Sequence, residues 1–166
     1  NPVVIFEDKL MYQDKANVPE DEYLIPFGEA AVLQEGNQVT LIGTSSMRQV
    51  CEDAARILED EEISVEIIDP RTLVPLDEKT ILNSAKKTGR VIVVDEGHQN
   101  FGVTAEIASR ISEKAFYYLD APVIRMGAMD VPVPFSPVLE DLTVPTAEKV
   151  ASNARKIIAG ELLHEL

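Results

Sequence analysis

The feature that most constrains this 166-residue chain is an alternation of strand patterns and helix patterns between residues 39 and 159. Short, continuous runs of β-branched residues predict strands that are buried on both faces. Apolar residues spaced three and four apart predict amphipathic helices between those strands. Strands that alternate with helices are typical of βαβ units. The sequence therefore predicts an α/β fold with a mostly parallel sheet covered by helices on both faces.

Local signals at the helix ends support this interpretation. Ser46, with Gln49 three residues later, matches a capping box at the start of the first helix. Asp77 and Thr146 are the expected N-caps of the second and last helices, and Gly89 is placed to end the second. A further helix is expected after residue 102. The expected strands are residues 39–42, 63–68, 91–94 and 122–125.

Residues 1–38 do not follow the alternation. Asn1 and Pro2 precede an apolar strand pattern without any lead-in, from which we expect that the chain is cut from something longer. A polar, proline-containing stretch at 13–21 is interpreted as a connector. Tyr23–Phe27 is expected to form a short edge strand, because proline is tolerated at the edge of a sheet.

Composition excludes several classes of function. The formal net charge of −14 argues against binding nucleic acid or an anionic membrane surface. No apolar run approaches the roughly 20 residues that cross a bilayer. One cysteine, Cys51, rules out an internal disulfide framework, and the presence of only two histidines argues against a Cys/His zinc cluster. We expect a protein of a reducing compartment, with no nucleic-acid or membrane partner.

Ligands of open parallel sheets usually bind beyond the carboxyl ends of the strands. The loop after the first strand lacks both the G-x-G-x-x-G pattern and the lysine of a phosphate-binding loop, so a capped helix start is favoured there over an anion site. No tract of the chain repeats internally. The candidate functional loops are residues 43–46, 69–74, 95–102 and 125–137.

Two side chains in these loops are candidates for a functional role. His98 lies between a buried strand and a helix, where it can act in proton transfer or bind a partner. No nucleophile is recognisable near it, which favours a structural or interface histidine. Arg71 can bind an acidic partner through both guanidinium arms, or form a salt bridge within the chain. Both alternatives stay open for Arg71.

The other reactive residue types do not assemble into an active site. Asp95 and Glu96 are adjacent and therefore point apart, unlike a paired acid and base. Cys51 falls on an apolar helix face and is expected in the core. His164 is expected to lie in a solvated tail. The composition and the spacing of residues therefore predict only an acidic α/β domain with loops on its ligand side.

Five blocks of sequence nevertheless resemble a known family. Their order and spacing are similar to those of the beta subunit of thiamine-diphosphate-dependent 2-oxo acid dehydrogenases, of the pyruvate, branched-chain or acetoin type. The resemblance covers nearly the whole chain and is specific as a set. The blocks are Asp69–Asp77, Thr88–Glu96, Gly102–Ala108, Leu119–Arg125 and Pro132–Glu140.

The resemblance places the chain in the C-terminal half of that subunit, the transketolase C-terminal domain. It implies a three-layer α/β/α sandwich with a mostly parallel five-stranded sheet and one antiparallel edge strand. Residues 1–28 would be the end of a preceding pyrimidine-binding domain and a connector, and residues 29–166 the transketolase C-terminal domain.

The resemblance also implies where the chemistry lies. In this family thiamine diphosphate and Mg²⁺ bind between the alpha subunit and the N-terminal half of the beta subunit. The Gly-Asp-Gly motif of the alpha subunit does not occur here. We therefore expect no catalytic, cofactor-binding or metal-binding residue in this chain, and no activity from it alone.

The implied partners are the alpha subunit, a second beta subunit in an α2β2 heterotetramer, and the subunit-binding domain of the lipoyl acyltransferase. Asp130 matches an acidic position that grips a basic residue of that module in relatives, and Arg71 and His98 are secondary candidates for partner contacts. His98 would lie near the active-site entrance or a subunit interface, although residues 99–101 depart from the family pattern.

The resemblance leaves alternatives for the function. The leading one is decarboxylation of a 2-oxo acid, or cleavage of acetoin, with acyl transfer to a lipoyl group by the whole enzyme. A free-standing docking module without catalysis is the second. Another transketolase-like enzyme that shares this domain is the third. The expected compartment is a bacterial or archaeal cytoplasm or, in a eukaryote, the mitochondrial matrix.

Overall fold

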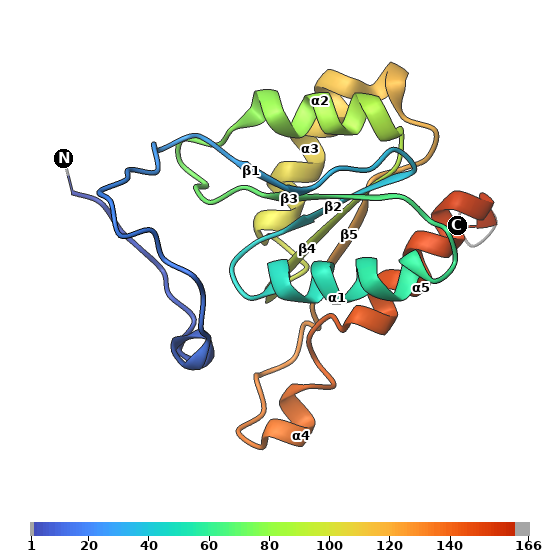
Figure 1. Ribbon diagram of the computed structural model, residues 1–166. Coiled ribbons are helices and arrows are strands. Elements are labelled where there is room, and N and C mark those ends of the chain that lie inside the picture. Colours follow the sequence, from blue (N-terminus) through green and yellow to red (C-terminus); the bar gives the residue numbers. More distant parts are fainter. Residues whose placement is uncertain (1, 162–166) are drawn as a thin grey trace.

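A computed structural model describes residues 2–161, so the prediction for His164 lies outside the described residues. The described chain forms a five-stranded sheet between two layers of helices (Figure 1). In the sheet, the strands follow the order β1-β3-β2-β4-β5, with β1 antiparallel to β3 and the other pairs parallel. The strands are β1 Ala31–Gln34, β2 Val39–Gly43, β3 Val65–Asp69, β4 Val91–His98 and β5 Ile124–Ala128.

Helices cover both faces of the sheet, which confirms the predicted three-layer α/β/α sandwich. One face packs against α1 and α5, and the other against α2 and α3 (Figure 1). The short α4 stands apart from both layers. The α-helices are α1 Met47–Glu59, α2 Glu78–Thr88, α3 Val103–Ala115, α4 Pro137–Glu140 and α5 Ala147–Ala159, and two 3₁₀ helices are η1 Lys9–Gln13 and η2 Phe116–Tyr118.

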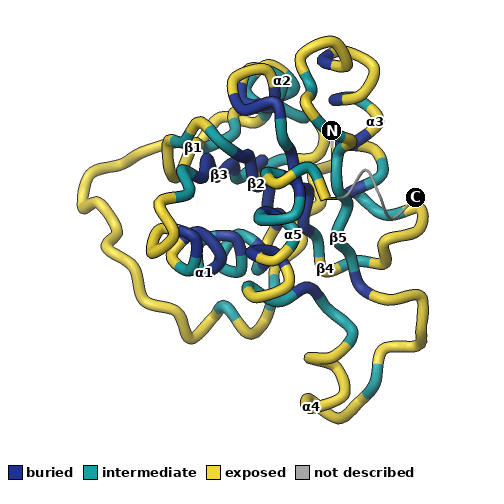
Figure 2. Tube along the Cα trace, turned by 90° about the vertical axis from the view of Figure 1, so that its right-hand side faces the viewer, coloured by how far each residue is buried: buried dark blue, intermediate teal, exposed yellow. Residues whose placement is uncertain are grey.

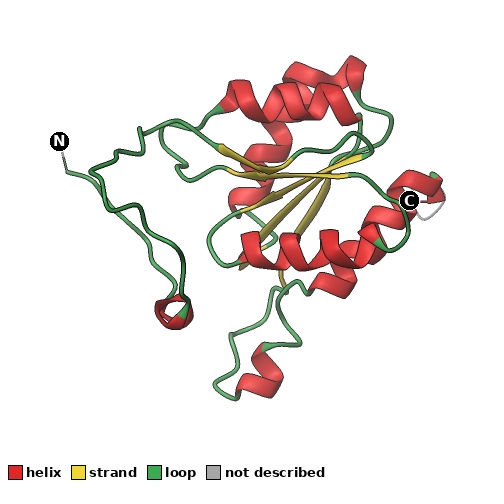
Figure 3. Ribbon diagram, viewed as in Figure 1, coloured by secondary structure: helices red, strands yellow, loops and turns green. Residues whose placement is uncertain are grey.

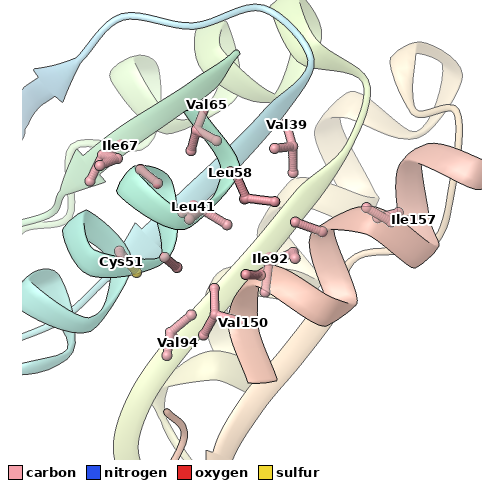
Figure 4. Close-up of a cluster of buried hydrophobic side chains, with 14 of the residues drawn as sticks. Val39, Leu41, Cys51, Leu58, Val65, Ile67, Ile92, Val94, Val150 and Ile157 are labelled. Carbon is pink, nitrogen blue, oxygen red and sulfur yellow. The ribbon is translucent and has the colours of Figure 1, made fainter. Parts of the chain in front are cut away.

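The two faces of the sheet bury separate apolar clusters, because alternate residues of a strand point to opposite sides. Leu41 and Ile92 face α1 and α5, where Cys51 and Leu58 also lie (Figure 4). The neighbouring strand residues face α2 and α3. Cys51 is fully buried, as the sequence predicted, and burial raises the pKa of its thiol to about 12.

The predicted edge strand is wrong in position. Tyr23–Phe27 is exposed and outside the sheet, whereas β1 forms the antiparallel edge, with Ala31 opposite Asp69. The chain turns at Gly28, whose φ of +79° suits a glycine and whose amide donates to the Thr72 hydroxyl at 2.9 Å. This turn, rather than the proline-containing stretch before it, brings the chain onto the sheet.

Four other local predictions need correction. Ser46 has helical backbone angles and no capping bond, because its hydroxyl donates to Glu96 instead. The loop expected at 95–102 is partly strand, since β4 continues to His98. The strand expected at 122–125 begins at Ile124 and runs to Ala128, in register with the longer β4. The strand expected at 63–68 occupies 65–69.

Two segments leave the sandwich. Residues 2–28 form a long loop at one side of the sandwich. This loop is almost wholly exposed and is interrupted by η1 (Figures 2 and 3). Residues 129–142, which carry α4, project from the edge of the sheet where the parallel strands end (Figure 1). We call residues 129–142 the protruding segment. No helix among the described residues is long and apolar enough to cross a membrane.

Candidate functional site

The carboxyl ends of β2, β3, β4 and β5 meet at one edge of the sheet, and every loop that the sequence singled out starts there. Hydrogen bonds join neighbouring loops across this edge. Thr44, after β2, donates its hydroxyl to Asp95, and Ser46 donates to Glu96 at 2.7 Å. Asp95 also accepts from the Gly97 amide at 2.9 Å. The two carboxylates therefore have separate partners, and no paired acid and base is formed.

His98 is the last residue of β4 and is exposed. Its Nδ1 lies 2.9 Å from the main-chain carbonyl oxygen of Met129, which follows β5 directly. Since a carbonyl oxygen only accepts, Nδ1 carries the proton in this contact and donates it. The Nε2 atom is left for solvent or a partner. No serine or cysteine within the described range 2–161 is hydrogen-bonded to His98, so the geometry favours the structural or interface role.

Asp130 begins the protruding segment and lies beside the same loop. Its Oδ2 accepts a hydrogen bond from the Asn100 side chain. Its Oδ1 has no hydrogen-bond partner among residues 2–161, and the residue is exposed. The structure thus brings His98 and Asp130 together, since the loop that follows β4 holds the start of the protruding segment through both contacts.

Arg71 lies in a different loop, after β3, and no hydrogen bond or ion pair among the described residues joins it to His98 or Asp130. Its amide donates to Asp69 at 2.9 Å, and its guanidinium forms no ion pair within the described chain. The internal salt bridge is therefore absent there. The side chain is exposed and can meet an acidic group of a partner.

Backbone strain gathers at this edge, which the sequence did not predict. Ser45, Arg71 and Phe101 follow β2, β3 and β4, and each has a positive φ, between 50° and 57°. Such angles are costly for residues with a Cβ and cluster at functional sites. Phe101 is also fully exposed. Only a comparison of backbone angles reveals this group, because none of the three residues is a glycine or asparagine.

The protruding segment is apolar on the outside. Its charged residues are acidic only, namely Asp130, Glu140 and Asp141. Exposed apolar patches of this kind mark interaction surfaces. The sequence analysis identified 125–137 as a candidate functional loop but gave no sign of how much apolar surface this region exposes. The large exposed apolar residues are Met129, Val131, Val133, Phe135, Val138, Leu139 and Leu142.

A second exposed group, which we call the aromatic corner, lies at the opposite edge of the sheet, before β5. It consists of Phe116, Tyr117 and Tyr118 in η2, with the first two rings packed edge to face at 5.5 Å. Asp120 follows and pairs with Arg90 at 3.1 Å. The sequence analysis did not single out these residues, although three consecutive aromatic side chains after a helix are a readable signal.

The described residues do not fit thiamine diphosphate or its Mg²⁺. No group of three His, Cys, Asp or Glu side chains within residues 2–161 is arranged to hold a metal ion. Glu66, the one nearly fully buried carboxylate of this range, is already paired with Lys87. A carboxylate that activates the cofactor would need to face a cavity instead.

The fold defines a class of protein, a three-layer α/β/α domain that exposes loops at its strand ends and several apolar segments. The family model "Transketolase, C-terminal domain" matches residues 28–150. The chain belongs to the transketolase C-terminal domain family.

Comparison with curated proteins identifies similar sequences within this family. The chain is 42% identical, over 99% of its length, to the beta subunit of acetoin:2,6-dichlorophenolindophenol oxidoreductase of Bacillus subtilis. It is 42% identical, over 95% of its length, to the beta subunit of the pyruvate dehydrogenase E1 component of Rickettsia felis. It covers 48% of each relative, so the chain spans about half the length of the curated relatives it matches.

A solved structure agrees with this assignment. The chain matches a split-gene transketolase, described as an inactive beta4 tetramer, with a TM-score of 0.73 and 27% identity. The match covers 88% of this chain and 46% of the other. The relatives named here are thus beta subunits of an acetoin:2,6-dichlorophenolindophenol oxidoreductase and of a pyruvate dehydrogenase E1 component by sequence, and a transketolase by structure.

Proposed function

We propose that this chain is the C-terminal domain of the beta subunit of a 2-oxo acid or acetoin dehydrogenase. Residues 29–166 would form the domain, and residues 1–28 the connector and the end of a preceding domain. The observation that carries the proposal is the 42% identity to an acetoin-type and a pyruvate-type beta subunit, over 95–99% of the chain. The whole enzyme would decarboxylate a 2-oxo acid, or cleave acetoin, and transfer the acyl group to lipoamide.

In this proposal the chain supports assembly and docking, and does not carry the chemistry. Thiamine diphosphate and Mg²⁺ would be held by an alpha subunit together with the N-terminal half of the beta subunit. The exposed apolar residues of the protruding segment, among them Phe135 and Val138, support contacts with other subunits of an α2β2 heterotetramer. Obligate interfaces of this kind are large and apolar.

The second proposed contact is the subunit-binding domain of a lipoyl acyltransferase. Asp130 supports it, because one carboxylate oxygen is unpaired within the described chain and the neighbouring charges of the protruding segment are also acidic. A basic module would be attracted to this surface. The net charge of −14 acts in the same direction.

Calorimetric titration of the assembled dehydrogenase with the subunit-binding domain tests the docking. Asp130→Asn removes the charge while keeping the shape and should weaken binding about tenfold or more. Asp120→Asn is the matched control, because Asp120 is an exposed aspartate at the aromatic corner, on the opposite edge. Weaker binding for Asp120→Asn alone would move the docking site to the aromatic corner. Absence of binding to the parent protein would contradict the docking function.

Transketolase itself is the alternative with an observation in its favour, since the structural match is to a split-gene transketolase. The sequence comparisons favour the dehydrogenase, because the identity is 42% there and 27% for the transketolase structure. Assays of the assembled enzyme with pyruvate, a branched-chain 2-oxo acid, acetoin and a ketose phosphate separate the two. Turnover of the ketose phosphate alone would contradict the proposed function.

A further inference from the structure

A shallow pocket of about 210 Å³ lies beneath the protruding segment. One wall is the end of β5, with Arg125 and Gly127, and the other is formed by residues 143–145 and the first turns of α5. Lys149 and Asn153 of α5 line it together with Gln99. None of the residues that line the pocket is acidic, although the chain contains 29 acidic residues and 15 basic ones.

The two cations of the pocket differ from most others in the structure because they lack carboxylate partners. Arg125 and Lys149 form no ion pair among the described residues. By contrast, the other half-buried arginines among residues 2–161 each pair with an aspartate or glutamate, namely Arg48, Arg90, Arg110 and Arg155. An acidic chain that leaves two cations unpaired in one concave site has a place for an external anion.

A main-chain contact holds Arg125, whereas the Lys149 side chain is exposed and forms no hydrogen bond among residues 2–161. Arg125 is half-buried and donates from one guanidinium nitrogen to the carbonyl oxygen of Gln99 at 3.1 Å, which leaves its other N–H groups available. Lys149 lies in the first turn of a thirteen-residue helix, and its carbonyl accepts from Asn153 at 3.0 Å. An arginine and a lysine together favour an oxyanion over a neutral ligand.

The nearest carboxylate along α5 does not compete for the pocket. Glu148 hydrogen-bonds its own amide and the Thr146 hydroxyl, and these bonds lower its pKa. It therefore stays ionised at the helix N-terminus, where a negative charge is favourable. Glu148 does not line the pocket, whose two charged side chains, Arg125 and Lys149, are both positive.

We propose that this pocket binds a small oxyanion, a phosphate or carboxylate group, between Arg125 and Lys149. The pocket, of about 210 Å³, is large enough for inorganic phosphate or a short carboxylic acid. A bound anion would link β5 to α5 at the base of the protruding segment. The inference is independent of the proposed function, because it concerns this chain alone.

Titration of the ¹⁵N-labelled 166-residue chain tests the site, with inorganic phosphate in one arm and pyruvate in the other, at constant ionic strength. We expect saturable shifts of the amides of Gln99, Gly127 and Lys149. Lys149→Gln should weaken binding about tenfold, since it removes one charge-assisted hydrogen bond. Lys15→Gln is the control, because Lys15 is exposed on the connector, and it should leave the affinity unchanged.

Saturation by phosphate alone or by pyruvate alone would identify the kind of anion, and saturation by both would assign the site to oxyanions generally. Shifts that rise linearly with either anion, or equal affinity in the Lys149→Gln variant and the parent, would overturn the proposal. Arg125→Gln offers a second test, and its thermal unfolding reports whether the loss of the Gln99 contact has disturbed the fold.

Discussion

The Nδ1 atom of His98 lies 2.9 Å from the carbonyl oxygen of Met129 and so joins the end of β4 to the start of the protruding segment. With the neighbouring contact between Asn100 and Asp130, it makes the position of that segment depend on the loop after β4. A histidine that resembles a catalytic candidate in the sequence is, in the structure, placed to hold an interaction surface.

Replacing His98 by alanine should therefore loosen the protruding segment without unfolding the sandwich. One hydrogen bond is lost, so the free energy of unfolding should fall by about 1 kcal/mol. Hydrogen exchange at residues 130–142 should speed up, whereas exchange in β2 and β4 should not. Glu96→Gln is the control, since it keeps the bond to Ser46. Unchanged exchange in the protruding segment would contradict this role for His98.

Replacing Lys87 tests how much the buried ion pair with Glu66 contributes to stability. Its ammonium pairs with Glu66, whose side chain is 2% exposed, and also with Glu35 at the surface. Among the hydrogen bonds of residues 2–161, Lys87→Met would leave the buried Glu66 carboxylate with the Gly36 amide as its one remaining donor, at 3.3 Å. We expect a loss of about 3 kcal/mol in urea unfolding. Lys79→Met, at an exposed position of the same helix, should cost far less. Equal losses would contradict the pairing.

Asp77 should contribute to stability in a pH-dependent way. Burial by itself raises its pKa, but hydrogen bonds from the Ala30 amide and from the Thr80 hydroxyl and amide outweigh burial and lower the pKa. A lowered folded-state pKa gives stability that is present above the unfolded value of about 3.9 and is lost as pH falls through the folded value.

Asp77→Asn, which retains a good capping residue, should therefore lose stability near neutral pH and show a weaker decline between pH 5 and pH 3. Urea midpoints across this range measure the effect. Asp21→Asn, on the exposed connector, should follow the parent curve. Parallel curves for the parent and Asp77→Asn would show that the carboxylate of Asp77 contributes nothing through ionisation.

Cys51 should be chemically silent in the folded protein. It is fully buried, and burial raises its thiol pKa to about 12, so almost no thiolate is present at pH 8. A thiol reagent should modify Cys51 of the folded protein only as fast as the structure around Cys51 opens. In 8 M urea, where the protein is unfolded, the reaction should be fast. Rapid stoichiometric reaction without denaturant would contradict the packing of α1 against the sheet.

Local patterns predicted the parts of the fold that local physics decides. The β-branched run at 91–94 specified a central strand, and Asp77 with Gly89 marked both ends of α2. Ser46 failed as a cap because a residue 50 positions away, Glu96, takes its hydroxyl. The edge strand was misplaced because pairing of Ala31 with Asp69 depends on the turn at Gly28 rather than on strand propensity.

The candidate site depends even more on long-range contacts. His98 and Asp130 were recognised separately, but their meeting requires β4 and β5 to be adjacent and parallel, which one sequence does not reveal. The pocket that contains Arg125 and Lys149 depends in the same way on α5 returning to the sheet beside β5. Positive φ angles at Ser45 and Phe101 have no sequence signal at all.

The central claim is that this domain works inside a larger assembly and does not act alone. Native mass spectrometry of the protein purified from its source tests that claim most directly. The account predicts an α2β2 heterotetramer in which the chain that contains this sequence has about twice the mass of the 18.3 kDa described by the sequence. A single 18.3 kDa species without any partner chain would contradict it.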